Sequence, residues 1–335
     1  MSKKKIIALF ITLVLLGAIF YKIDWSELIR TFKDFDFKNI WQIIIFYVLT
    51  LYIRGIRWKA LLLNDKKYSS LHLGEVFTVG SMLNIFLPAR AGDVYRAYYL
   101  GSVKGEKKMK VFGSIILERT LDGISVFFML LIAILLYCKQ QWILHIAYGI
   151  GALFIGSLAV FYVIFKFNKI EEICGWFSNL AGKLPEKFAE PSKRAVEKVC
   201  CYTKSFMEGF TVLDYPKYWL IACVTSVLVW GIEAYVAYLI VDSFGLGLGF
   251  SAGLFVLSLI SFSTMIPSTS VFLGPYQVAY LMALGIFGIE KSTALAVSTV
   301  HQGILIIILT VLGGYYLLKF NISMKDIPVS YTHLT

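Results

Sequence analysis

Apolar residues in this chain form long continuous runs that short charged segments separate. The runs are roughly 16–27 residues long and do not alternate between apolar and polar positions, as strands of a membrane barrel would. Because lipid offers the backbone no hydrogen-bond partners, such runs predict membrane-spanning helices. The predicted spans are residues 6–21, 39–53, 111–137, 144–165, 218–241 and 293–318.

Two further apolar stretches are each broken by proline and glycine. Residues 71–100 have basic residues beyond both ends, and since Lys and Arg favour the cytoplasmic side, they predict a re-entrant hairpin that opens to the cytoplasm. Residues 250–288 have the same form and open to the outside. Non-helical backbone at membrane depth requires burial in protein or a wet cavity. The predicted turn residues are Asn84, Pro88, Gly92, Pro267, Gly274, Pro275 and Gln277.

The order of elements in residues 5–137 recurs with opposite topology in residues 144–320. A short echo accompanies this order, because 95–100 reads Tyr-Arg-Ala-Tyr-Tyr-Leu and 276–281 reads Tyr-Gln-Val-Ala-Tyr-Leu. Inverted repeats with broken helices are a transporter architecture, and the binding site lies where the broken segments meet. We predict an all-α polytopic membrane protein with about six full transmembrane helices and two re-entrant helical hairpins in an inverted repeat.

Composition agrees with a membrane protein, since 58% of the 335 residues are hydrophobic and only 16% are charged. The net charge of +11 lies in the segments between spans, as the positive-inside rule expects, and gives no reason to expect nucleic acid. Lys3–Lys5 and Lys319 predict cytoplasmic termini in a bacterial-type cell (inner) membrane. One domain is expected over 1–327, with an amphipathic cytoplasmic segment at 166–216 and a non-native-looking tail at 328–335.

The sequence offers no motif for a metal or a nucleotide. Its five cysteines have no CxxC spacing, its four histidines are scattered, and no P-loop is found. We therefore expect no cofactor.

Charged side chains inside predicted membrane segments are the main candidates for function. Each costs about 3 kcal/mol to place at mid-membrane, so seven of them need a reason. One interpretation is a binding site, because guanidinium groups bind phosphate bidentately. The other is a structural network that pairs Arg96 or Arg90 with Glu118, and Arg119 with Asp122 or Asp93. The seven candidates are Arg90, Asp93, Arg96, Glu118, Arg119, Asp122 and Glu233.

Glu233, which is one of these seven, and three other polar positions allow weaker interpretations. Glu233 is a candidate for carrying a proton or meeting a cationic headgroup, and equally for a structural contact. His301 is interpreted as a hydrogen-bonding residue between helices rather than a proton relay. Arg54 and Arg57 are interpreted as anchors at the cytoplasmic end of their span.

The segments Leu-Pro-Ala-Arg-Ala-Gly-Asp-Val-Tyr-Arg (87–96) and Leu-Glu-Arg-Thr-Leu-Asp (117–122) together resemble the transmembrane region of lysylphosphatidylglycerol synthases, the flippase-like domain family. The resemblance covers about 5–320. The family's later motif usually reads Pro-Gly-Gly-Leu-Gly followed by an acidic residue. Here the segment from Pro267 to Pro275 reads Pro-Ser-Thr-Ser-Val-Phe-Leu-Gly-Pro, with Gln277 near the usual acidic position. This departure leaves the substrate of the second hairpin open.

The resemblance implies a lipid flippase or translocase. In the multiple peptide resistance factor, this domain moves aminoacylated phosphatidylglycerol to the outer leaflet, and a separate soluble domain, expected to be absent here, performs aminoacyl transfer. Some members of the family are associated with glycosyltransferases, which implies lipid-linked sugars as another class of cargo. The expected partners are anionic or aminoacylated phospholipids and a separate lipid-modifying enzyme, with an oligomer left open. The alternatives are an intramembrane transferase with Asp93 and Glu118 as acid and base, or a non-transporting partner subunit.

Overall fold

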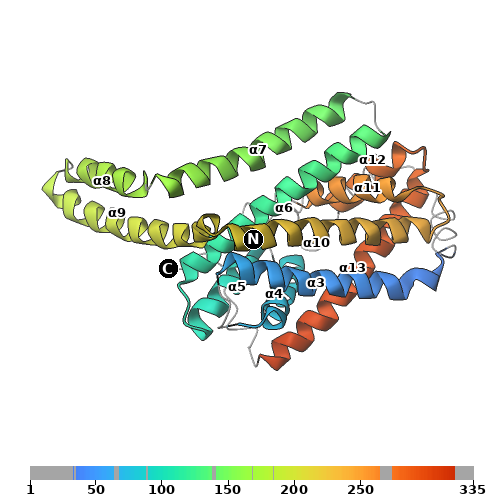
Figure 1. Ribbon diagram of the computed structural model, residues 1–335, viewed down its shortest axis with the longest axis horizontal. Coiled ribbons are helices and arrows are strands. Elements are labelled where there is room, and N and C mark those ends of the chain that lie inside the picture. Colours follow the sequence, from blue (N-terminus) through green and yellow to red (C-terminus); the bar gives the residue numbers. More distant parts are fainter. Residues whose placement is uncertain are drawn as a thin grey trace.

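The computed structural model describes residues 33, 35–63, 68–87, 90–137, 141–167, 169–183, 185–264 and 274–320. Within these ranges the chain is helical and contains no strand (Figure 1). Several predictions lie outside the described residues: the span at 6–21, Pro88, Pro267 and the tail at 328–335.

Five helices of the described chain are long and apolar enough to cross a membrane. They correspond to five of the six predicted spans, and the sixth is the one at 6–21. Their bounds are α3 Ile40–Leu61 (preceded by the short η1 Phe37–Asn39), α6 Lys108–Tyr137, α7 Gln141–Lys166, α10 Pro216–Asp242 and α13 Lys291–Lys319.

The predicted end of the second span at Ile53 is wrong, because α3 continues to Leu61. In the sequence, the first arginine after the apolar run predicts the end of the span. In the structure, however, Arg54 is 7% exposed and Arg57 is 0% exposed. Both guanidinium groups face carboxylates of neighbouring helices, so the helix continues with its charges inside the protein.

Each predicted hairpin contains two short helices that pack against one another. The first is α4 Ser70–Phe86 with α5 Ala91–Tyr98, followed by a π-helical turn at Tyr99–Val103. The second is α11 Phe250–Ser263 with α12 Pro275–Gly285. A proline opens α12 at a position where its missing N–H costs no hydrogen bond.

The first hairpin closes tightly because two glycines meet. A Cβ atom on Gly92 would lie 1.8 Å from the carbonyl oxygen of Gly80. The Asn84 side chain then joins the two arms: its Oδ1 accepts a hydrogen bond from the Gly92 N–H at 2.8 Å, and its Nδ2 donates to Asp93 Oδ1 at 3.3 Å. Asn84 and Gly92, predicted as turn residues, therefore fix the geometry that positions Asp93.

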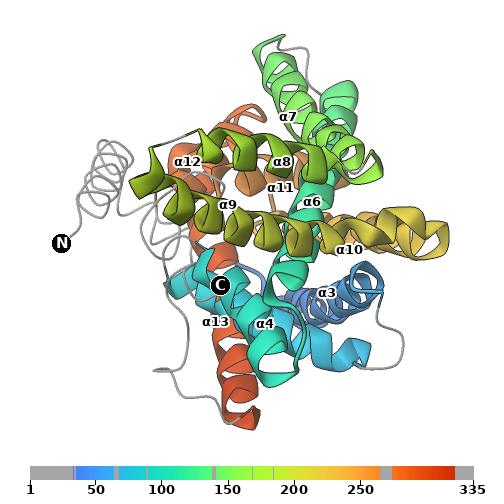
Figure 2. The ribbon, with the colours of Figure 1, turned by 90° about the vertical axis from the view of Figure 1, so that its left-hand side faces the viewer.

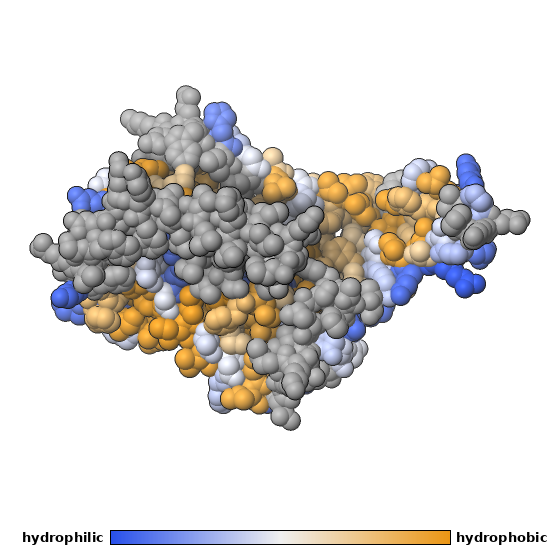
Figure 3. Space-filling view, turned by 180° about the vertical axis from the view of Figure 1, so that it is seen from behind, coloured by the Kyte–Doolittle hydropathy of each residue, from blue (hydrophilic) through white to orange (hydrophobic). Residues whose placement is uncertain are grey.

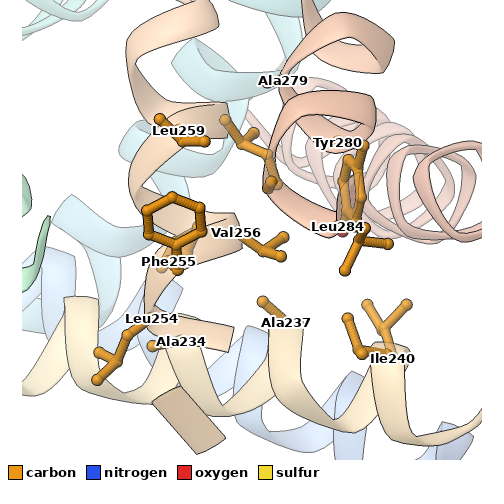
Figure 4. Packing of buried hydrophobic residues seen from close by; sticks show 14 of the residues in the cluster. Ala234, Ala237, Ile240, Leu254, Phe255, Val256, Leu259, Ala279, Tyr280 and Leu284 are labelled. Atoms are coloured by element: carbon orange, nitrogen blue, oxygen red, sulfur yellow. The ribbon is translucent and has the colours of Figure 1, made fainter. Parts of the chain in front are cut away.

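The long helices form a layered bundle around the two hairpins. α3 packs along α10, α4 lies against α3 and α13, and α11 lies against α10 and α6. The largest apolar core of the described residues forms where α10, α11 and α12 meet α6 and α13, with Ala234, Ala237 and Ile240 facing residues such as Val256 and Leu284 (Figure 4). The small alanine side chains let the helices approach closely, as is common between helices in membranes.

The outer surface of the long helices is apolar. Large side chains remain exposed there, including Ile45 of α3, Leu153 of α7 and Val227 of α10. In Figure 3, orange apolar residues extend across the middle of the visible described surface, and hydrophilic residues gather mostly toward its ends. Contiguous exposed apolar surface of this extent fits contact with lipid rather than water.

Two further helices, α8 Lys169–Gly182 and α9 Glu186–Met207, extend away from the bundle beyond the end of α7 (Figures 1 and 2). They pack as an antiparallel pair joined by a disulfide between Cys174 and Cys200. A hydrogen bond of 2.9 Å from Lys204 Nζ to Glu171 lowers the pKa of that carboxyl. The sequence predicted amphipathic helices here but not the disulfide, because the two cysteines lie 26 residues apart.

The glycine contact in the first hairpin predicts a large effect of a small substitution. Gly92→Ala would force its methyl group against the Gly80 carbonyl, so the hairpin must open, at a cost of roughly 2 kcal/mol or more. Thermal unfolding in detergent should show a clear loss of Tm. Gly314→Ala on α13, where an added Cβ meets nothing within 4 Å, is the matched control. Equal Tm values for the two variants would contradict this packing.

Candidate functional site

A group of buried charged side chains lies where four helices meet. We call it the charge cluster, and it contains four arginines and four carboxylates. Six of the seven predicted site residues belong to it, and two arginines that the sequence analysis treated as anchors join them. Its members are Arg54 and Arg57 of α3, Asp93 and Arg96 of α5, Glu118, Arg119 and Asp122 of α6, and Glu233 of α10.

Glu118 lies at the centre of one half of the charge cluster. Its side chain is fully buried and meets three guanidinium groups: Arg96 Nη2 at 2.7 Å from Oε2, with Arg57 Nη2 at 3.2 Å and Arg119 Nη2 at 2.9 Å from Oε1. A buried carboxylate is tolerated when such charge-assisted hydrogen bonds surround it. The predicted pairing of Arg96 with Glu118 is therefore confirmed.

Asp122 forms the centre of the other half, one helical turn further along α6. Arg57 Nη1 lies 2.6 Å from Oδ1, and Trp230 Nε1 donates to the same oxygen at 2.9 Å. Arg119 Nη1 lies 3.3 Å and Arg54 Nη1 3.8 Å from Oδ2. Arg57 thus bridges Glu118 and Asp122 and holds α3 to α6.

Arg54 and Arg57 are not surface anchors, and that interpretation is wrong. Arg54 Nη2 donates to Glu233 Oε1 at 2.7 Å, while Arg57 serves both acidic residues of α6. A signal was present in the sequence: the two arginines are three residues apart and so share a helix face, as Glu118 and Asp122 do at a spacing of four.

Aromatic rings also contact two of the arginines. The Arg96 guanidinium lies 4.0 Å from the Trp58 ring centroid and 4.7 Å from that of Phe77. Arg54 lies 5.2 Å from Phe77 and 5.6 Å from Trp230. Such cation–π contacts favour a charge that has left water.

Two cavities adjoin the charge cluster. The first chamber has a volume of about 270 Å³ and is lined by Arg90, Arg119, Asp122, Val126, Phe154, Trp230, Ser261 and Thr264. The second chamber, of about 180 Å³, is lined by residues that include Tyr47, Glu233, Tyr276 and His301. Trp230, Ser261 and Thr264 line both, so the chambers are neighbours between α10 and α11.

Arg90 lines the first chamber. It precedes α5 and has a backbone φ of 52°, an uncommon left-handed conformation for a residue other than glycine. Because backbone strain of this kind clusters at ligand sites, its conformation is consistent with a binding role. The structure thus brings Arg90 and Arg119, both predicted site residues, to one cavity wall.

The second hairpin is joined to α13 by neutral groups. Gln277 Oε1 accepts the Gly274 N–H at 2.8 Å, and Gln277 Nε2 donates to Gln302 Oε1 at 2.8 Å. The Tyr280 hydroxyl hydrogen-bonds to Nδ1 of His301, so His301 joins α12 and α13 as an interhelical residue. Across the described residues, no group of three or more His, Cys, Asp or Glu side chains is arranged to hold a metal ion.

The bond between Arg96 and Glu118 predicts a strong energetic coupling. Arg96→Gln alone should destabilise the protein by about 3 kcal/mol or more, because it leaves Glu118 short of one buried partner. The double variant with Glu118→Gln should lose less than the sum of the two single variants, by about 1 kcal/mol or more. Thermal or denaturant unfolding in detergent measures all four proteins. Strict additivity would show that the two side chains do not interact.

Comparison with known proteins places this chain in a family. The chain matches the family model described as lysylphosphatidylglycerol synthase TM region over residues 5–313. No solved structure matches the chain significantly.

Three curated relatives share parts of the chain. A UPF0104 membrane protein of Pyrococcus horikoshii is 25% identical over 334 residues, which cover 95% of this chain and 97% of the relative. Another, of Methanocaldococcus jannaschii, is 26% identical over 72% of this chain and 95% of the relative. The glycosyltransferase AglD of Haloferax volcanii is 29% identical over 35% of this chain and 19% of its own length. Because the family match spans nearly the whole chain, this protein belongs to the lysylphosphatidylglycerol synthase transmembrane-region family.

Proposed function

We propose that this protein translocates a lipid with an anionic headgroup between the leaflets of the membrane. The observation that carries the proposal is the first chamber, where Arg90 and Arg119 line a cavity beside membrane-spanning helices. A guanidinium group binds phosphate through two parallel hydrogen bonds, which an apolar membrane interior would strengthen. A headgroup would enter this chamber while its acyl chains remain in lipid.

The helix contacts support an inverted repeat as the framework for movement. α3 packs against α4 as α10 packs against α11, and α5 against α6 as α12 against α13. The contact of α4 with α13 likewise corresponds to the contact of α11 with α6. α3 packs against α10, which is its own counterpart in the second half. If the first half is exchanged with the second, each contact corresponds to one in the other half, and the α3–α10 contact corresponds to itself. Alternating access between inverted repeats requires such a correspondence.

Side-chain contacts repeat between the two hairpins as well. Tyr95 and Tyr99 stack with ring centroids 6.0 Å apart, and Tyr276 and Tyr280 lie 5.6 Å apart. The residue after each first tyrosine reaches the next long helix: Arg96 reaches Glu118, and Gln277 reaches Gln302. An ion pair in one half thus corresponds to an amide pair in the other, so we assign headgroup binding to the first hairpin.

The geometry gives less support to an intramembrane transferase. A general acid or base must reach the proton that it moves, but the Glu118 carboxylate is fully buried among three guanidinium groups and does not line the first chamber. The comparisons leave more than one kind of lipid as a candidate cargo. The family name refers to a phospholipid, and the relative AglD is named as a glycosyltransferase. A phosphate attached to a lipid is the chemistry common to these cargoes.

Reconstituted vesicles test the proposal. Wild-type protein should accelerate movement of fluorescent phosphatidylglycerol across the bilayer, and the pair of substitutions Arg90→Gln and Arg119→Gln should reduce that rate by about tenfold or more, as expected for loss of a bidentate phosphate contact. Arg194→Gln, on the exposed surface of α9, is the matched control and should keep the wild-type rate.

Two results would contradict the proposal. One is no movement by folded wild-type protein of phosphatidylglycerol, aminoacylated phosphatidylglycerol or a lipid-linked sugar phosphate. The other is the appearance of a chemically altered lipid without transfer between leaflets, which would support a transferase instead. Size-exclusion profiles of all variants separate loss of transport from loss of fold.

A further inference from the structure

The second chamber contains hydrogen-bonding groups that have no part in holding a phosphate. It has a volume of about 180 Å³ and shares Trp230, Ser261 and Thr264 with the first chamber. The next group of a lipid headgroup is bonded directly to the phosphate, so a phosphate in the first chamber places that group beside the shared wall. The second chamber has room for several water molecules or for a small polyol such as glycerol.

The Tyr276 hydroxyl is the most informative group in this chamber. Tyr276 lies in the first turn of α12 and is 5% exposed, and its hydroxyl oxygen has no hydrogen-bond partner among the described residues. The neighbouring Tyr280 hydroxyl is already bonded to Nδ1 of His301. Contacts with these two rings, at centroid distances of 5.6 Å and 6.1 Å, fix the Tyr276 ring in place. Because a buried hydroxyl without a partner costs stability, its position at a cavity wall points to a ligand that completes its hydrogen bonding.

The other polar groups of this wall offer mainly acceptor oxygens. Ser261 Oγ donates its proton to the Leu257 carbonyl at 2.7 Å, and Thr264 Oγ1 donates to the Ser261 carbonyl at 2.8 Å, so their lone pairs remain able to accept. The Glu233 carboxylate is kept ionised by Arg54, whose Nη2 donates to Oε1 at 2.7 Å. A carboxylate has about four acceptor positions, and this contact uses one. A ligand here must therefore donate hydrogen bonds to these oxygens and accept one from the tyrosine.

A hydroxyl group meets both requirements, because it donates one hydrogen bond and accepts others. An ammonium group donates only and has no lone pair for the Tyr276 O–H. The Arg54 guanidinium also places a positive charge beside the Glu233 carboxylate, and this charge opposes the approach of a second cation. The chamber therefore favours an uncharged group with several hydroxyls.

We propose that the second chamber binds the uncharged, hydroxyl-bearing part of a lipid headgroup whose phosphate lies in the first chamber, an inference that rests on the proposed function. The Tyr276 O–H donates to one ligand hydroxyl, and Glu233, Ser261 and Thr264 accept hydrogen bonds from ligand hydroxyls. The substrate class is a phosphodiester lipid with a polyol headgroup, such as glycerol, inositol or a sugar. Tyr276 is then a residue that determines specificity.

Competition binding to detergent-purified protein tests the proposal, with a short-chain phosphatidylglycerol that is fluorescently labelled on an acyl chain as the probe. The competitors are unlabelled short-chain phosphatidylglycerol and phosphatidylmethanol, which carry the same phosphodiester charge but differ in headgroup hydroxyls. Wild-type protein should bind phosphatidylglycerol about tenfold more tightly, as one or two hydrogen bonds would provide. Tyr276→Phe should weaken binding of phosphatidylglycerol several-fold and leave that of phosphatidylmethanol unchanged.

Tyr95→Phe is the matched control. Tyr95 begins the segment 95–100 as Tyr276 begins the similar segment 276–281. It is 1% exposed, and its hydroxyl also has no partner among the described residues, but it is not among the described residues that line either chamber. Tyr95→Phe should keep the wild-type preference. Both variants should have a Tm at least equal to that of wild-type protein, because neither loses a hydrogen bond.

Four results would overturn the proposal. They are equal affinity of wild-type protein for the two competitors, equal weakening of both by Tyr276→Phe, a clear loss of Tm in Tyr276→Phe, and tighter binding of short-chain phosphatidylethanolamine than of phosphatidylglycerol. The last would assign the chamber to an ammonium group. If wild-type protein binds these lipids with the expected preference but moves none of them in vesicles, the proposed function fails alone. If it binds none of them, the proposed function fails and this inference with it.

Discussion

Burial of charge in a membrane segment is the constraint around which this structure is organised. Glu118 and Asp122 lie one turn apart on α6, and Arg57 of α3 binds both, at 3.2 Å and 2.6 Å. Either carboxylate alone would be costly in an apolar environment, and removal of one partner would leave a charge uncompensated. The same pairs set the position of α3, α5 and α10 around α6, so the packing of the bundle and the geometry of the site have one cause.

In each half of the protein, a side chain of the hairpin binds a side chain of the following long helix, but the two contacts differ in charge. In the first half, an arginine of the hairpin reaches a glutamate of the following helix, whereas Gln277 and Gln302 form a neutral pair in the second. A charged pair attracts additional charges, and Arg57 and Arg119 both gather at Glu118. The neutral amide pair has no charge that would attract further charged side chains. This difference explains why the cationic wall of the first chamber lies beside the first hairpin.

Much of the helical framework could be predicted from the sequence, because long apolar runs in lipid allow little else. The motif residues of 87–96 and 117–122 also indicated where buried charges would meet. The sequence was less informative about Arg54 and Arg57, because an arginine near the end of an apolar run usually marks the membrane surface. Only the position of α6 and α10 beside α3 shows that these arginines have carboxylate partners inside the bundle. The Cys174–Cys200 bridge likewise depends on how α8 and α9 turn back on one another.

The central claim is that the charge cluster and Arg90 together hold one lipid anion at the first chamber. Native mass spectrometry of protein extracted from a mixed-lipid membrane tests it most directly. The wild-type protein should retain an anionic phospholipid in preference to zwitterionic ones, and the variant with Arg90→Gln and Arg119→Gln should lose this preference while remaining folded. Retention of the same lipids in the same proportions by both proteins would contradict the claim.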